Sequence, residues 1–256
     1  MSNVITIFRK ELQSYFNSPI AYLVMGFFGL IAGYFFYAYV ALFVQRGMQS
    51  EMMGRGFPMD VNEWVIRPLL SNLSVVSLFL IPMITMRLFA EEKRSGTIEL
   101  LATSPVHDVE IILGKWFAAM ALYASVLAIA GISVATLFFY GKPDIAPIFT
   151  GFLGLLLQGG CLLALGTFIS TTTKNQIVAA FATFGVSLLL WIIDWAGQSD
   201  PSAGWAKVLS YLSVITHFEP FSKGVIDAKD VVFYLSVIFF GLFLTARSME
   251  SLRWRA

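Results

Sequence analysis

The sequence predicts an all-α integral membrane protein with six transmembrane helices, and two observations carry this prediction. Of the 256 residues, 57% are apolar and only 13% are charged, whereas about a quarter of the residues of a soluble domain are charged. The charged residues are also unevenly spaced, and they enclose six uncharged runs of 16 to 34 residues. Because a bilayer-crossing helix needs roughly 20 apolar residues, each run is interpreted as one span of a single transmembrane domain, residues 1–256.

The spans follow from these runs in order. They are expected near Ile20–Val44, Leu69–Met86, Trp116–Tyr140, Pro147–Ser170, Ile177–Trp195 and Val231–Ala246. The last run is the shortest, and we expect its ends to reach water through the side chains of Asp230 and Arg247. The first run is longer than the apolar part of a signal peptide, which has about 7–15 residues. It is therefore expected to remain as a helix.

An amphipathic helix is predicted before the first span, over residues 1–18. Its apolar side chains share one helical face, whereas the charged side chains fall largely elsewhere. This face consists of Val4, Ile5, Phe8, Leu12, Tyr15 and Phe16. We expect the helix to lie in the membrane interface and to turn into the first span at Asn17, Ser18 and Pro19.

The distribution of basic residues predicts the orientation. Six spans place both termini on one side of the membrane. If that side is cytoplasmic, the inner segments hold 10 Lys and Arg residues and the outer segments hold 7. Cytoplasmic loops carry the excess of basic residues, so both termini are predicted to be cytoplasmic. The outer segment 196–230 contains one more apolar run, Val208–Phe218, which is too short to span and is expected to be interfacial or re-entrant.

The largest predicted inner connection is residues 87–115, which holds nine charges. Glu91–Arg94 is expected to extend the second span as a helix into water, and Gly96 to end it, because glycine tolerates turn conformations. A short helix is expected at Ile98–Ala102, and a further helix is expected to start at Ser104 and Pro105.

Two leucines on the short helix need an explanation, because they lie away from the bilayer. Leu100 and Leu101 either pack onto the loop itself or fill a groove in a partner protein. The residues alone leave both alternatives open.

Three stretches of the sequence resemble the permease subunits of type-2 ABC transporters. The loop reads EEKRSGTIELLATSP and is followed by GK, and it resembles the cytoplasmic loop of these subunits. The opening KELQSYFNSPIAY resembles their interfacial helix and first span. The closing HFEPFSKGVIDAKD, which includes Glu219 and Asp227, resembles the segment before their last span. The motifs keep their order over essentially the whole chain, and the most similar subfamily is that of the gliding-motility-associated ABC permeases.

The resemblance implies that the loop around residues 91–104 carries a coupling helix, which docks in a groove of a separate ATPase subunit. The candidate contact residues are Glu92, Arg94, Gly96, Thr97, Glu99, Leu100 and Leu101. It further implies that the partner ATPase binds ATP and Mg, and that a second permease subunit, a copy or a relative, and an accessory extracytoplasmic protein complete the assembly. The implied location is the bacterial cytoplasmic (inner) membrane, and the implied direction of transport is export.

The chain itself lacks the sequence features of an enzyme. A phosphate-binding loop needs a glycine five positions before a Gly-Lys pair and a Ser or Thr after it. Here Gly114 and Lys115 are followed by Trp116, and Val109 occupies the earlier position. We therefore expect no ATP hydrolysis and no bound cofactor or metal in this chain. The net charge of +1 and the absence of a basic run also argue against a nucleic-acid partner.

Two other functions are compatible with the sequence. A transporter driven by an ion gradient would need paired ionisable residues in mid-membrane, and no predicted span carries one in its middle. A membrane scaffold or regulator that does not transport could use the same loop to hold a partner.

Several polar residues near or within the spans are expected to have structural roles. Gln158 lies inside the fourth span and is expected to form a hydrogen bond across helices. Asp194 lies between two tryptophans, where a position at the wet interface is favoured. His217 and Glu219 could titrate together, although a structural placement is favoured for both.

Overall fold

The computed structural model describes residues 2–52, 60–98, 106–199 and 204–253, which are helical with short turns and contain no strand. The helices are α1 (Ser2–Asn17), α2 (Pro19–Met52), the π-helix η1 (Asn62–Ile66), α3 (Arg67–Thr85), α4 (Ala90–Ser95), α6 (Asp108–Ala135), α7 (Leu137–Tyr140), α8 (Ile145–Thr172), α9 (Gln176–Ser199), α10 (Gly204–Leu212), α11 (Val214–Ser222) and α12 (Ala228–Arg253).

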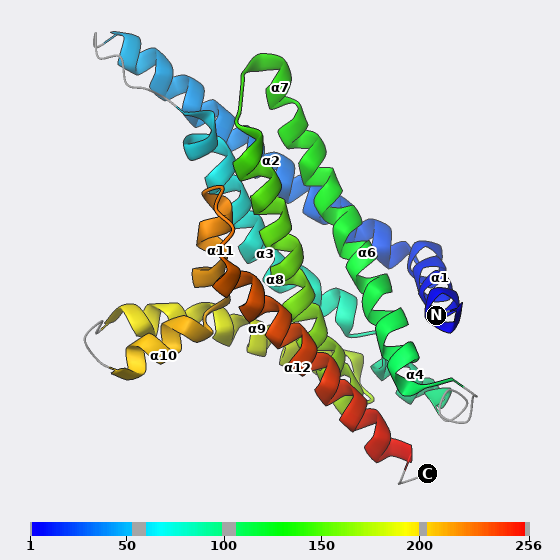
Figure 1. Ribbon diagram of the computed structural model, residues 1–256. Coiled ribbons are helices and arrows are strands. Elements are labelled where there is room, and N and C mark those ends of the chain that lie inside the picture. The colour runs from blue at the N-terminus through cyan, green and yellow to red at the C-terminus, as the bar shows by residue number, and fades with distance from the viewer. Residues whose placement is uncertain (1, 53–59, 99–105, 200–203, 254–256) are drawn as a thin grey trace.

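Six helical segments of the described chain are long and apolar enough to cross a membrane. They are Pro19–Met52, Asn62–Ser95, Asp108–Tyr140, Ile145–Thr172, Gln176–Trp195 and Ala228–Ser251. Both termini and α4 lie at one end of the bundle, and α7 lies at the other (Figure 1). The prediction of an all-α protein with six spans is therefore confirmed.

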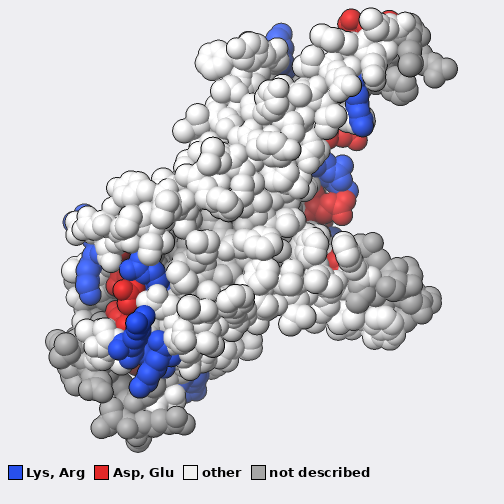
Figure 2. Space-filling view, turned by 180° about the vertical axis from the view of Figure 1, so that it is seen from behind, with Lys and Arg blue, Asp and Glu red and all other residues white. Residues whose placement is uncertain are grey.

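Charged side chains gather at two ends of the face in Figure 2 and leave a broad uncharged surface between them. This surface is the one expected for contact with the hydrocarbon core, which excludes unpaired charge. The 34 residues of α2 reach about 51 Å at 1.5 Å per residue, compared with about 30 Å for that core. The first span thus continues well beyond Val44, where the uncharged run had placed its end.

The helix α8 lies at the centre of the bundle and packs against α3, α6, α9, α11 and α12. Glycines allow these close approaches. A Cβ atom on Gly159 would overlap the ring of Tyr123, and one on Gly166 would lie 2.6 Å from Oγ1 of Thr85. Because interiors are packed to near-crystalline density, these positions cannot carry a side chain without displacing α6 or α3.

Polar side chains join α3, α6 and α8 inside the bundle. Oγ of Ser74 donates to Oε1 of Gln158 at 2.7 Å, and Nε2 of Gln158 donates to the Ser74 carbonyl oxygen at 3.3 Å. The hydroxyls of Ser77 and Tyr123 lie 2.8 Å apart. The predicted hydrogen bond of Gln158 across helices is confirmed.

The connection after the second span differs from the prediction. The expected helical extension at Glu91–Arg94 is a separate helix, α4, because α3 ends at Thr85 and a turn at residues 86–89 intervenes. The next described helix begins at Asp108, and Ser104 and Pro105, where a helix start was predicted, lie outside the described residues. At the start of this helix, the carboxylate of Glu110 accepts a hydrogen bond from the backbone N–H of His107 at 3.2 Å. This bond gives a partner to one of the backbone donors at the helix N-terminus.

The segment before the last span also differs in detail. The apolar run 208–218 forms parts of two helices, α10 and α11, which are separated at Ser213. The last span is longer than its uncharged run, since α12 covers Ala228–Arg253. Asp230 does not reach toward water as expected, because only 1% of it is exposed and it binds His217.

Candidate functional site

A buried ion cluster joins three helices at the end that carries both termini. Nζ of Lys115, on α6, lies 3.0 Å from Oε1 of Glu11 on α1 and 2.8 Å from Oε1 of Glu92 on α4. It also lies 5.3 Å from the ring centroid of Phe89. The Lys115 side chain is only 2% exposed, so it is held by these partners rather than by water.

The residue before Lys115 explains how α1 comes so close. A Cβ atom on Gly114 would lie 2.8 Å from Cβ of Ile7 on α1. Glycine at 114 therefore permits the helix contact, and the lysine at 115 fixes its position. The Gly-Lys pair that follows the loop thus has a structural role in the packing of α1 on α6.

The first turn of α4 is fastened to the end of α8. Oγ of Ser170 accepts hydrogen bonds from the backbone N–H groups of Phe89 and Ala90, each at 3.1 Å. These groups have no partner within the helix, and Ser170 satisfies them from a neighbouring one. Lys93 donates to the carbonyl oxygen of Thr171, which brings a second residue of α4 onto α8.

Two further contacts extend this attachment. The guanidinium of Arg87 donates to both carboxylate oxygens of Glu91, at 2.8 and 3.3 Å, and to Oγ of Ser18 at 3.1 Å. Ser18 is the residue at which α1 turns into α2. Near it, Tyr15 is partly buried, and this burial raises the pKa of its hydroxyl above the ordinary value.

The far end of α4 is exposed. Arg94, Ser95, Gly96 and Thr97 all lie at the surface. Gly96 has a φ of 75°, the left-handed conformation that favours glycine at the end of a helix. Beyond it, Ile98 packs back against the hydrophobic core. Residues 94–97 thus form an exposed tip on a firmly attached base.

The candidate coupling residues fall into three groups. Arg94, Gly96 and Thr97 lie together at the exposed tip. Glu92 points away from the tip, since its carboxylate binds Lys115 and its side chain is 17% exposed. The remaining candidates, Glu99, Leu100 and Leu101, lie outside the described residues.

Sequence reasoning missed two residues of the attachment, Lys115 and Ser170. A signal for the lysine was present, because it immediately precedes 26 uncharged residues and so marks the edge of a span. Ser170 carried no such signal, because a serine at the end of an apolar run is common and its two backbone partners lie 81 and 80 residues earlier in the chain.

A second polar cluster lies at the opposite end. Nδ1 of His217 lies 2.6 Å from Oδ1 of Asp230, and its Nε2 lies 2.8 Å from the carbonyl oxygen of Tyr211. His217 thus pairs with Asp230 rather than with Glu219, in agreement with a structural placement. Asp194 also has a partner here, because Oγ1 of Thr216 donates to its Oδ1 at 2.9 Å.

Glu219 belongs to a separate surface group. Its Oε1 lies 2.6 Å from Nζ of Lys223 and 3.3 Å from Nη2 of Arg67. The hydrogen bond from Lys223 lowers the pKa of the Glu219 carboxyl below its ordinary value, and the charges of Lys223 and Arg67 act in the same direction.

A comparison with known protein families identifies the family of this chain. A family model described as ABC-2 family transporter protein matches residues 5–231, which is well over half of the chain. The chain belongs to this family. No curated protein matches the sequence. ABC-2 family proteins are multi-pass membrane components of ABC transporters, which associate with an ABC ATPase and are generally not catalytic themselves. The resemblance to the gliding-motility subfamily stays a prediction.

Proposed function

We propose that this ABC-2 protein is the permease subunit of an ATP-driven exporter in the bacterial cytoplasmic membrane, with both termini cytoplasmic. Residues 91–104 would couple it to a separate ATPase, which binds ATP and Mg. A second permease subunit would complete the membrane part. The observation that carries this proposal is the exposed tip at residues 94–97 on a base attached to α1, α6 and α8.

The mechanism follows from how α4 is attached. The turn at residues 86–89 separates it from α3, so it would tilt about this turn with little change in α3. Its own contacts run to α1 and α6 through Lys115 and to α8 through Ser170. A displacement of the tip would therefore be passed to these three helices, and Thr171, whose Oγ1 donates to Ser248 at 2.8 Å, would pass it on to α12.

This mechanism divides the candidate residues between two roles. Arg94, Gly96 and Thr97 are exposed and can meet the ATPase, together with Glu99, Leu100 and Leu101 as predicted from the sequence. Glu92 is turned inward and holds the base of the lever through Lys115. The accessory extracytoplasmic protein and the gliding-motility subfamily rest on the sequence resemblance alone.

Cross-linking from single cysteines tests the proposed contact. The only cysteine, Cys161, is buried, and Cys161→Ala supplies a background free of cysteine. In that background, Thr97→Cys probes the tip, and Tyr140→Cys, 92% exposed at the opposite end, is the matched control.

In native membranes, we expect Thr97→Cys to cross-link to a P-loop ATPase identified by mass spectrometry, and Tyr140→Cys not to. A P-loop ATPase cross-linked only from position 140 would contradict the orientation. If neither position yields one, the scaffold or gradient-driven alternatives are favoured.

A further inference from the structure

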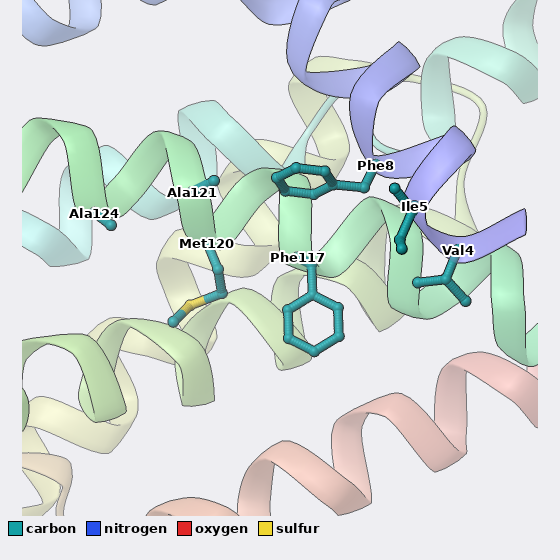
Figure 3. A pocket seen from close by; sticks show the side chains of 7 residues that line it. All are labelled: Val4, Ile5, Phe8, Phe117, Met120, Ala121 and Ala124. Carbon is teal, nitrogen blue, oxygen red and sulfur yellow. The ribbon is translucent and has the colours of Figure 1, made fainter. Parts of the chain in front are cut away.

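An apolar groove of about 490 Å³ runs between α1 and α6. Figure 3 shows the side chains of α1 at one end of it, while those of α6 continue past them toward Ala124. Its lining carries no polar side chain and consists of Val4, Ile5, Phe8, Phe117, Met120, Ala121 and Ala124. The groove is long and has small alanine side chains along part of its lining.

A second hollow continues this groove along α6. It has a volume of about 210 Å³, shares Ala124 with the first, and extends to Gly131. Phe152 and Leu156 of α8 line its other side. From Phe117 to Gly131, the path along α6 is about 21 Å at 1.5 Å per residue. One leaflet of the hydrocarbon core is about 15 Å thick, so the path crosses a whole leaflet.

The surroundings of the groove favour a lipid as its occupant. Because α6 is long and apolar enough to span the membrane, we expect a groove on its outer surface to open into the bilayer. Phe117 is 46% exposed and Ile5 is 53% exposed on either side of the opening. A narrow path of this length, lined only by apolar groups and open to the membrane, matches an extended acyl chain.

Basic side chains on α1 indicate the charge of the headgroup. Arg9 lies one helical turn after Ile5 of the groove, and both Arg9 and Lys10 are exposed. The one carboxylate of α1, Glu11, is turned inward onto Lys115 and does not neutralise them. Arg9 also lines a shallow hollow of about 300 Å³ with Leu12, Gln13, Phe16 and Asn17, which offers donors suited to a phosphate.

We propose that the groove between α1 and α6 binds one acyl chain of an anionic phospholipid, whose phosphate lies against Arg9 in the neighbouring hollow. The bound lipid would fill the space between α1 and the spanning bundle, and would fasten the interfacial helix to the membrane. This proposal rests on the membrane position of α6 and is independent of the transported substrate.

Native mass spectrometry of the delipidated full chain in mild detergent tests this proposal. The probes are phosphatidylglycerol and phosphatidylcholine with identical acyl chains. Two basic residues near a membrane surface favour an anionic lipid by about 30-fold, roughly fivefold each. We therefore expect one phosphatidylglycerol to bind about 30-fold more tightly than phosphatidylcholine, and Arg9→Gln to reduce that ratio about fivefold.

Filling the groove provides the second test. Ala124→Phe should weaken both lipids about tenfold or more, the effect of excluding two methylene groups from apolar surroundings. The matched control is Val232→Phe, at an exposed position on α12, and it should leave binding unchanged. If Ala124→Phe fails to fold, Ala121→Phe tests the same groove from one turn away.

Three results would overturn the proposal. Equal binding to the wild type and to a folded groove-filling variant would place the lipid elsewhere. Equal affinity for the two lipids would remove the role of Arg9. A photo-cross-linking residue in place of Ile5 that captures a second copy of the chain, and no lipid, would show that protein covers the groove.

Discussion

Replacing Lys115 by methionine should lower the free energy of unfolding by about 3–5 kcal/mol, the usual cost of removing one partner from a buried ion pair. The lysine lies 2.8 and 3.0 Å from two carboxylates. At an effective dielectric constant of about 20, each contact contributes roughly 6 kcal/mol of attraction, most of which is offset by desolvation. Without the ammonium group, Glu11 and Glu92 would face each other with no cation between them.

The measurement is a titration with SDS in mixed micelles, followed by circular dichroism. A triple variant, Lys115→Met with Glu11→Gln and Glu92→Gln, should recover most of the loss, because it removes the three charges together. The control is Lys142→Met, an exposed lysine in the connection before α8, which should stay within about 0.5 kcal/mol of the wild type. A loss below about 1 kcal/mol for Lys115→Met, or a triple variant no more stable than the single one, would refute this reasoning.

Three further predictions concern the bundle and its opposite end. Gly159→Ala should lower the free energy of unfolding by about 1–3 kcal/mol in the same titration, because its Cβ atom would overlap a buried tyrosine ring of α6. Gly33→Ala, whose Cβ atom would meet open space, should leave the free energy of unfolding unchanged. His217→Phe should lower the free energy of unfolding by about 3–5 kcal/mol, because it leaves the buried Asp230 carboxylate unpaired. Asp230→Asn should lower it by less than about 2 kcal/mol, because the new amide can still donate a hydrogen bond to the imidazole. Reversal of either order would contradict the corresponding contact. For Glu219, whose carboxyl pKa is lowered in the folded state, the stabilisation is present above the ordinary value near pH 4.3 and is lost as the pH falls through the lowered pKa. The difference in melting temperature between Glu219→Gln and the wild type should therefore be present at pH 7 and vanish in strong acid, and a difference that persists there would contradict it.

The spans could be predicted because they depend on local composition. An apolar run long enough to cross the bilayer forms a helix whatever its neighbours are, since every backbone polar group must be satisfied within the segment. The ends of the spans were predicted less well, because α2 and α12 continue beyond the uncharged runs. Water does not end a helix, and residues 45–52 extend α2 with polar and charged side chains included.

The attachment of the predicted coupling loop shows where sequence reasoning stops. Glu92 stands among four consecutive charged residues, and nothing in that run separates it from its neighbours. Its inward direction is set by the turn at residues 86–89 and by the packing of α1 on α6, which brings Lys115 within reach. Such a cluster unites segments about 80 and 100 residues apart, so only the folded arrangement reveals it.

The pairing of His217 with Asp230 illustrates the same limit. Both residues lie in the stretch that resembles the segment before the last span, and Glu219 is the nearer acidic residue in the chain. On α11, however, positions 217 and 219 point in different directions, so His217 faces α12 while Glu219 faces Lys223 and Arg67.

Co-purification from native membranes tests most directly whether this chain is the membrane subunit of an ATP-driven transporter. The wild type should bring down a P-loop ATPase in mild detergent. A variant with Glu99→Lys and Leu101→Asp, shown by circular dichroism and SDS titration to be folded, should lose it. Absence of an ATPase from the wild type in several mild detergents, or its undiminished presence with the folded variant, would contradict the proposed coupling through the loop after α4.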